Sequence, residues 1–210
     1  MADKLSIYKA ALRLLGPHEL KTLTDNRPER YQLDDAWDGA VAFLLTQGLW
    51  NFAIRSVEIS HDDDVEPLFG YQFGFRKPDD YIRTVGISNE PTFQSGFESY
   101  TDETLSWFAN WDPLYVRYTS TLPEYGLNIG KWRQPFANAL AAYLAFQSGL
   151  PVSNDRGNRN DIYALYKDEL KRAKAVDAFD ESVKYAAPGR MVRNRFNRWG
   201  YRGYMGYGGG

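Results

Sequence analysis

The sequence contains no cysteine and only two histidines, His18 and His61. The lack of cysteine excludes disulfide bonds, cysteine nucleophiles and thiolate metal sites. Two histidines are a poor basis for a zinc enzyme, because catalytic zinc usually takes two or three histidine ligands. The sequence patterns of phosphate-binding loops, dinucleotide folds and nucleophile elbows are also missing. From these residues we expect no catalytic residue, no metal site and no cofactor.

Long apolar runs are missing as well. No stretch of about 18 apolar residues is present, so we expect no helix that spans a membrane and no membrane partner. The first residues, M-A-D-K-L-S, lack the charged-then-apolar pattern of a secretory signal. We therefore expect the protein to be made in a cytoplasm.

Aromatic residues are abundant. They make up 16% of the chain, with 15 Tyr, 12 Phe and 6 Trp. Aromatic side chains give a large contact area at low entropic cost and are enriched at interfaces. The high aromatic content therefore indicates either a protein that binds partners or a Trp-rich core. Five of them are predicted core anchors: Trp37, Trp50, Phe52, Trp132 and Phe136.

Hydrophobic periodicity predicts four helices, over residues 3–15, 28–50, 130–149 and 160–178. Residues 51–122 instead hold short alternating segments separated by Gly, Pro and Asp, a pattern typical of strands. We therefore predict a mostly α (α+β) fold. It is a bundle of about four helices with one small inserted antiparallel β-sheet, in a body that spans residues 1–180.

The charge is unevenly distributed. The chain has a net charge of −2, but residues 181–210 alone carry +5, which leaves −7 on residues 1–180. Such asymmetry indicates an interaction tail. Three Gly-Tyr pairs close this segment, and it buries too little apolar surface to offset the entropy of ordering. We predict an extended C-terminal arm over residues 181–210 that is disordered in the free monomer.

The composition of the predicted arm suggests two kinds of partner, and a plain disordered end without a partner is the third possibility. Arginines interleaved with aromatics can bind single-stranded nucleic acid through phosphate contacts and stacking. They can equally bind an acidic protein groove, because arginine pairs with carboxylates and tyrosine fills pockets. The candidate contact residues of the arm are Arg193, Arg195, Phe196, Arg198, Trp199, Tyr201, Arg202, Tyr204 and Tyr207.

Two acidic clusters offer candidate sites in the body. The run His61-Asp62-Asp63-Asp64 can be a cation site or a solvated turn, and it lacks the Gly and the distal Glu of a calcium loop. Asp34, Asp35 and Asp38 can supply the carboxylate pair of a glycoside hydrolase. Residues 34 and 38 are neighbours on a helix, however, and form no cleft, which favours a solvated or interface face.

Three stretches carry a resemblance to a known family. They are L-L-T-Q-G-L-W-N-F-A-I-R at 44–55, F-R-K-P-D-D-Y-I-R-T-V at 75–85, and L-P-E-Y followed by W-R-Q-P-F-A-N-A-L-A-A-Y-L-A within 122–144. Together with the order of the predicted elements, they resemble the head-to-tail adaptor (connector) proteins of tailed phages, in particular the tail tubular protein A-like family. The C-terminal arm lies outside these stretches.

The resemblance implies a structural virion protein at the head–tail junction. It implies a ring of about twelve copies beneath the portal protein, joined to a tail nozzle or other tail component, with the genomic DNA passing through the lumen without sequence-specific binding. An acidic body suits such a lumen, because it repels the DNA backbone. The arm, which can extend to roughly 100 Å, is expected to fold on binding the portal. A virion-associated cell-wall hydrolase and a nucleic-acid-binding module that acts through the arm are the alternatives.

Overall fold

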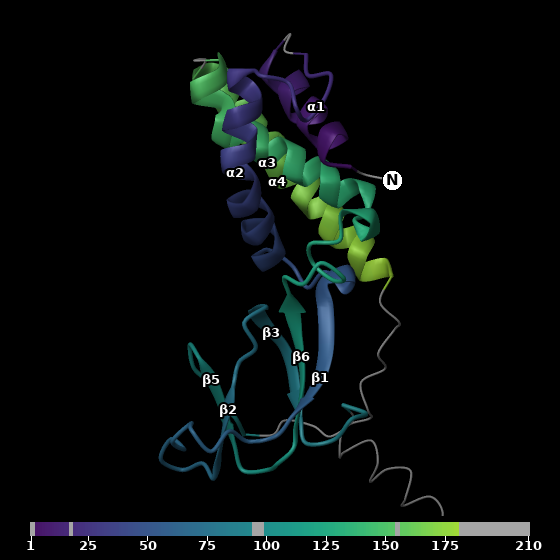
Figure 1. The fold of residues 1–210 in the computed structure, drawn as a ribbon. Helices are drawn as coiled ribbons and strands as arrows, with labels where there is room; N and C mark the ends of the chain where they lie inside the picture. Colours follow the sequence, from purple (N-terminus) through teal and green to yellow (C-terminus); the bar gives the residue numbers. More distant parts are fainter. Residues whose placement is uncertain (1–2, 17–18, 94–98, 154–155, 181–210) are drawn as a thin grey trace, which may run out of the picture. The chain divides into compact units, whose positions relative to one another are not determined.

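The structure is a computed structural model that describes residues 3–16, 19–93, 99–153 and 156–180 (Figure 1). The predicted arm and all nine of its candidate contact residues lie outside the described residues. The helices are α1 (Lys4–Leu15), α2 (Pro28–Thr46), α3 (Gln134–Ser153) and α4 (Arg156–Phe179), with short 3₁₀ helices η1 (Asn51–Ala53) and η2 (Ile129–Lys131). The strands are β1 (Ile54–Ile59), β2 (Phe73–Arg76), β3 (Tyr81–Ser88), β4 (Thr101–Asp102), β5 (Ser106–Ala109) and β6 (Leu114–Ser120).

The prediction of a mostly helical bundle with one small sheet is wrong. The strands form two separate three-stranded antiparallel sheets, and less than half of the described residues are helical. In sheet A the order is β1-β6-β3, and in sheet B it is β2-β5-β4. Each sheet is built around its own central strand, so six short strands give two layers, and the fold is α+β.

The two sheets share a hydrophobic core of their own. Phe75, Trp107 and Ala109 come from sheet B, and Leu114, Val116 and Tyr118 come from sheet A; all six are buried. The indole Nε1 of Trp107 donates to Oγ1 of Thr84 on β3 at 3.0 Å. A buried indole needs such a partner, so this bond fixes the position of sheet B on sheet A.

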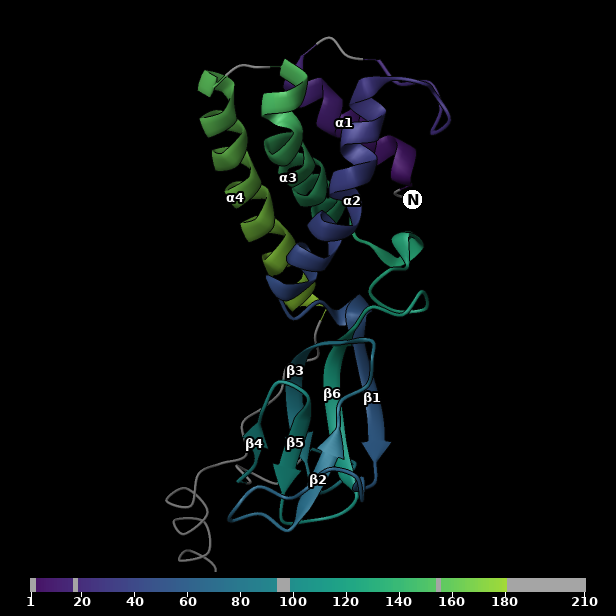
Figure 2. The same cartoon turned by 60° about the vertical axis from the view of Figure 1, so that its left-hand side comes forward.

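The helices are arranged around α3, which lies between α4 and α2 (Figure 2). It packs against α1, α2 and α4. Its buried face is rich in alanine, and the small side chains let the neighbouring helices approach closely. The buried alanines are Ala137, Ala139, Ala141, Ala142 and Ala145.

The predicted core anchors lie in this helical part. Trp37, Trp50, Trp132 and Phe136 are buried in one cluster, and Phe52 is partly buried against it. The ring of Phe136 meets the rings of Trp50 and Trp132 edge-on, at centroid distances of 4.9 and 5.1 Å. The edge-on arrangement is favourable for aromatic pairs beyond the area that they bury.

The second helix ends earlier than its hydrophobic pattern predicts, at Thr46 and not at residue 50. Trp50 folds back and its indole Nε1 donates to the Leu44 carbonyl at 2.8 Å. The same carbonyl accepts from the backbone N–H of Gln47 at 3.0 Å, so the helix end is held by two donors. A Cβ on Gly48 would lie 3.0 Å from the Trp50 ring. The apolar run therefore continues beyond the helix because Trp50 belongs to the core, not because the helix continues.

Candidate functional site

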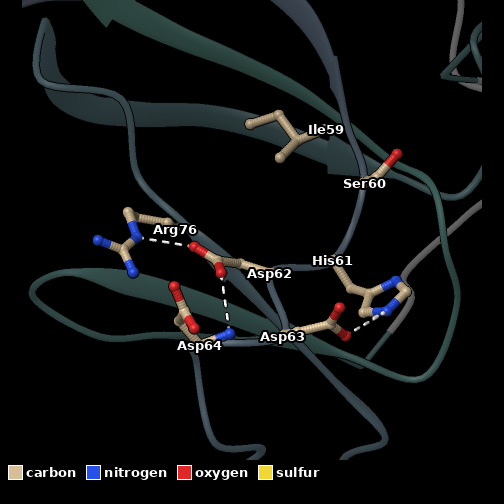
Figure 3. Close-up of a pocket in the computed structure, with 7 residues that line it drawn as sticks. All are labelled: Ile59, Ser60, His61, Asp62, Asp63, Asp64 and Arg76. Carbon is tan, nitrogen blue, oxygen red and sulfur yellow. Dashed lines mark hydrogen bonds and ion pairs between the residues drawn. The ribbon is translucent and has the colours of Figure 1, made fainter.

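The acidic run after β1 is an ion-paired loop (Figure 3). Asp62 accepts from Arg76 Nε at 2.7 Å and from the backbone N–H of Asp64 at 3.0 Å. Asp63 lies 3.2 Å from Nε2 of His61. Within the described ranges, no group of three or more His, Cys, Asp or Glu side chains is placed to hold a metal ion. The carboxylates of Asp62 and Asp63 thus have protein partners in place of a cation.

His61 also connects this loop to the turn before β6. Its backbone N–H donates to Asp112 at 2.9 Å, and its Nδ1 lies 3.0 Å from the other carboxylate oxygen. The hydrogen bond to Asp112, together with the charges of Asp112 and Asp63, raises the pKa of His61 above its ordinary value. The imidazole therefore connects the two loops, and its interaction with Asp112 and Asp63 is stronger when the ring is protonated.

The acidic cluster on α2 is split between two environments. Asp34 is paired with Lys4 at 3.1 Å and Arg30 at 2.6 Å, and it accepts from the Tyr8 hydroxyl at 2.7 Å. Burial alone would raise the pKa of Asp34, but the bonds from Tyr8 and Lys4 hold it below the ordinary value. A carboxylate with a lowered pKa is a poor general acid. Asp35 and Asp38 are exposed, and within the described residues neither has an ion-pair partner.

The three stretches that carry the resemblance meet where the helices join sheet A. Arg55, at the end of the first stretch, pairs with Asp80 of the second at 3.2 Å. Phe136 of the third stretch meets Trp50 and Phe52 of the first edge-on, with ring centroids 4.9 and 5.0 Å apart. The indole of Trp132 donates to the Gly126 carbonyl at 3.0 Å. Their shared position explains why these residue types occur together: they build one junction.

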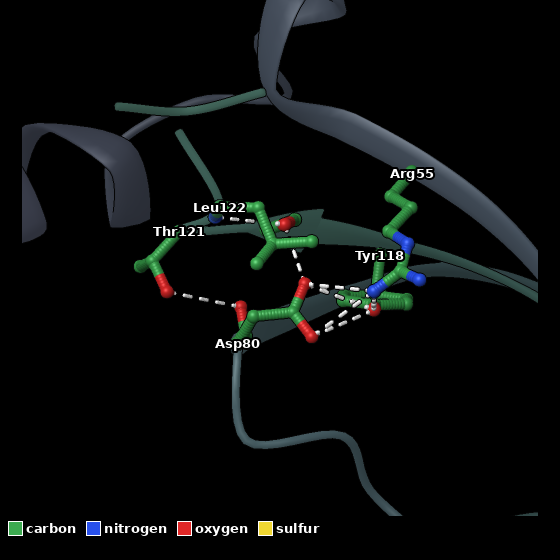
Figure 4. A network of polar contacts seen from close by, with 6 residues as sticks. Arg55, Asp80, Tyr118, Thr121 and Leu122 are labelled. Carbon is green, nitrogen blue, oxygen red and sulfur yellow. Dashed lines mark hydrogen bonds and ion pairs between the residues drawn. The ribbon is translucent and has the colours of Figure 1, made fainter. Parts of the chain in front are cut away.

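Asp80 lies at the centre of this junction (Figure 4). Its carboxylate accepts hydrogen bonds from the guanidinium of Arg55 on β1 and from the hydroxyls of Tyr118 and Ser120 on β6. Its backbone carbonyl accepts from the N–H of Thr121 at 2.9 Å. One side chain thus holds two strands of sheet A and the loop that precedes the third.

The protonation of these groups follows from the same contacts. Burial alone would raise the pKa of Asp80, but the bonds from Ser120 and Tyr118 and the charge of Arg55 hold it below the ordinary value. Burial and the hydrogen bond to Asp80 raise the pKa of Tyr118 to about 12. Asp80 is therefore ionised and Tyr118 is neutral near neutral pH. With its oxygens already occupied, Asp80 has the partners of a structural ion pair rather than those of a catalytic base.

A second connection joins the end of α4 to the same junction. The backbone N–H of Asn51 in η1 donates to the carboxylate of Asp177 at 3.0 Å. The side-chain amide of Asn51 donates to the backbone carbonyl of Asp177 at 2.7 Å. Asp177 is 7% exposed. The last turn of α4 is therefore fixed to the start of the strands across 126 residues of sequence.

Sequence reasoning missed an aromatic surface that crosses three helices. Phe43 of α2 stacks on Tyr143 of α3 with ring centroids 4.6 Å apart, and Phe146 of α3 lies 4.9 Å from Tyr163 of α4. Phe43 and Tyr163 remain 37% and 38% exposed. Lys167 lies over the Tyr163 ring at 4.3 Å. The spacing of Tyr163, Lys167, Lys171 and Lys174 along one side of α4 was the available signal for this surface.

None of the helices in the described ranges combines the length and apolar character needed to cross a bilayer. Comparison of the sequence with protein-family models gives no match, and neither does comparison with curated proteins.

Proposed function

We propose that this protein is a structural virion subunit: a head-to-tail adaptor that forms a ring between the portal and the tail nozzle, through which the genome passes. The observation that carries the proposal is the junction around Asp80. The three stretches with adaptor-like sequence are separate in the chain, yet they meet where a two-sheet insert joins a helical core. Arg55 of the first pairs with Asp80 of the second, and Phe136 of the third packs against Trp50 and Phe52 of the first. Sequence similarity at residues that join the helices to the sheets supports a shared fold more strongly than similarity scattered over the surface.

The exposed apolar side chains support a subunit with several contacts. On the helices, Phe43, Tyr163 and Phe179 are exposed, the last at 87%. In the loops of the β insert, Phe69 is 90% exposed and Leu105 is 76% exposed. Single exposed apolar residues are ordinary, but apolar residues gathered on one surface indicate binding. A ring subunit needs such surfaces both towards its neighbours and towards the next ring.

In this proposal the predicted arm binds the portal. Its arginines pair with acidic groups of the portal, and its aromatic residues fill pockets. The arm folds as it docks, so adaptors join only a completed portal. The acidic body leaves the DNA free to slide through the lumen.

The test uses the full-length protein and the portal ring of the phage that encodes it. In one variant Arg193, Arg195, Arg198 and Arg202 are all changed to Ala, and in the control Lys9, Arg13, Lys21 and Arg27 of the body are changed to Ala. We expect the arm variant to lose co-sedimentation with the portal at least about 100-fold, because several charge-assisted bonds are removed together. Equal portal binding by the wild-type protein and the arm variant would contradict the role of the arm.

A further inference from the structure

We propose that neighbouring copies dock through two unlike surfaces of the helices. An acidic face on α2 of one copy binds an aromatic–lysine face of the next copy. This inference rests on the proposed ring and adds which surfaces build it. The acidic face consists of Tyr31, Asp35, Asp38 and Ala42, and the aromatic–lysine face consists of Phe43, Tyr143, Phe146, Tyr163, Lys167, Lys171 and Lys174.

The aromatic–lysine face carries positive charge that no carboxylate of the described residues neutralises. Lys171 and Lys174 are exposed, and within the described residues neither has a carboxylate partner. Lys167 has the Tyr163 ring as its neighbour. A second cation, Arg159, lies 4.6 Å from the Phe146 ring at the other end of this face. The surface therefore offers aromatic area for burial and cations for an acidic partner.

The acidic face has the opposite character. Its four residues are spaced i, i+4, i+7 and i+11, so they form a single stripe along α2. Asp35 and Asp38 have no cation partner among the described residues, whereas Asp34 is fully paired towards α1. Gly39 beside this stripe has nothing within 4 Å of its Cβ position. Small residues at 39 and 42 leave space for the side chains of a partner helix.

The two faces lie on different sides of α2. Around the helix axis, Phe43 lies about 140° from Asp38 and about 80° from Asp35. A copy can therefore use both faces at once, one towards each neighbour. Contacts between unlike faces are heterologous, and they close into a ring when the rotation between copies allows it. The acidic face and the aromatic–lysine face carry opposite charges, so each face of one copy complements the other face of a second copy. This complementarity favours a second copy over an unrelated protein as the partner.

The first test is disulfide crosslinking. The chain has no cysteine of its own, so only introduced cysteines can form disulfides. Asp38→Cys and Lys171→Cys are introduced together and separately, and disulfide formation is followed both on portal-bound particles and in concentrated free protein. We expect the double variant to give a ladder of dimers, trimers and larger species. The two single variants, mixed in equal amounts, should stop at dimers, and each alone should stay uncrosslinked.

A charge exchange tests the same contact without relying on disulfide geometry. The variants Asp35→Lys/Asp38→Lys and Lys171→Glu/Lys174→Glu should each weaken association between copies at least about tenfold, because like charges then face each other. An equal mixture should restore association, since each variant then meets a complementary neighbour. Asp161→Lys/Asp168→Lys, on the other flank of α4, is the control and should have no effect.

The outcomes separate this inference from the proposed function. If copies assemble on the portal but no ladder forms and the mixture restores nothing, the docking faces are wrong while the ring proposal stands. If no association is found with or without the portal, both are wrong. A ladder together with restoration by the mixture supports the two faces.

Discussion

Asp80 is the single residue on which the junction depends most. It is mostly buried, with 12% of its side chain exposed, and it accepts from Arg55, Tyr118 and Ser120. A buried carboxylate is stable only when it is paired and hydrogen-bonded. Removing its charge leaves the Arg55 guanidinium without its partner. The resulting loss of folding free energy is larger than the average contribution of one hydrogen bond.

We predict that Asp80→Asn lowers the free energy of unfolding by about 2 kcal/mol. The measurement is urea unfolding followed by tryptophan fluorescence. Asp79→Asn is the matched control, because Asp79 is exposed and has no ion-pair partner among the described residues; it should change stability by less than about 0.5 kcal/mol. Equal effects of the two substitutions would show that the network adds no stability.

The same residue predicts a pH dependence. Because the pKa of Asp80 is lowered in the folded protein, its contribution is fully present above the ordinary aspartate pKa of about 3.9. It is lost as the pH falls through the folded-state value. The stability difference between the wild type and Asp80→Asn should therefore stay constant from about pH 8 to pH 5 and shrink at lower pH. A difference that grows on acidification would contradict this assignment.

His61 predicts the opposite direction. Its pKa is raised in the folded protein by Asp112 and Asp63, so its contribution is present below the ordinary histidine pKa of about 6.5 and is lost as the pH rises through the folded value. The urea midpoint of His61→Gln should lie furthest below that of the wild type at acidic pH, and the gap should narrow in alkaline buffer. A gap that does not vary with pH would mean that the imidazole acts only through its neutral hydrogen bonds.

At the scale of elements, the connection between sheet A and α3 passes through Gly126. Its N–H donates to the carbonyl of Ser120 at 3.1 Å, and a Cβ at this position would lie 2.3 Å from that same oxygen. Any side chain here must push the end of β6 away from the loop. A glycine is therefore required by close approach of the backbone.

We predict that Gly126→Ala destabilises the protein by about 1–3 kcal/mol through this clash. Gly39→Ala is the control at an open helical position, where nothing lies within 4 Å of the added Cβ. It should stabilise the protein by about 0.5–1 kcal/mol because alanine is the better helix former. Both values come from urea unfolding, and the account is contradicted if Gly126→Ala unfolds at the same midpoint as the wild type.

The elements also show what could be predicted from the sequence. The existence of four helices and of a strand-rich insert followed from local periodicity, since each helix buries a stripe and each strand alternates. The division into two sheets did not follow, because β1 pairs with β6 and β2 with β5 across long loops. Alternation reveals that a strand exists but not its partner. Likewise, the pairing of Asn51 with Asp177 is a tertiary contact with no local signal.

The candidate sites show the same limit at residue level. The adjacent acidic residues of α2 look alike in the sequence, yet Asp34 is paired towards α1 while Asp38 faces outwards. The role of Asp80 depends on Arg55 and Tyr118, which lie on two other strands. The spacing of Lys167, Lys171 and Lys174 was visible in the sequence, but the aromatic rings beside them come from other helices.

At the scale of the whole molecule, the described residues form two hydrophobic clusters, one among the helices and one between the sheets. The Asp80 network and the Asn51–Asp177 bonds lie where the chain passes from one cluster to the other. The buried polar groups thus hold the fold. In the proposed ring, the exposed aromatic and charged faces are the surfaces that bind neighbouring copies.

The proposed function requires the protein to assemble as a ring on the portal. The most direct measurement is the particle mass of the purified full-length protein, alone and mixed with the portal ring of its phage, by mass photometry. We expect a small species for the protein alone and a ring-on-ring complex with the portal. A mass of one chain, 24.1 kDa, in both samples would contradict it.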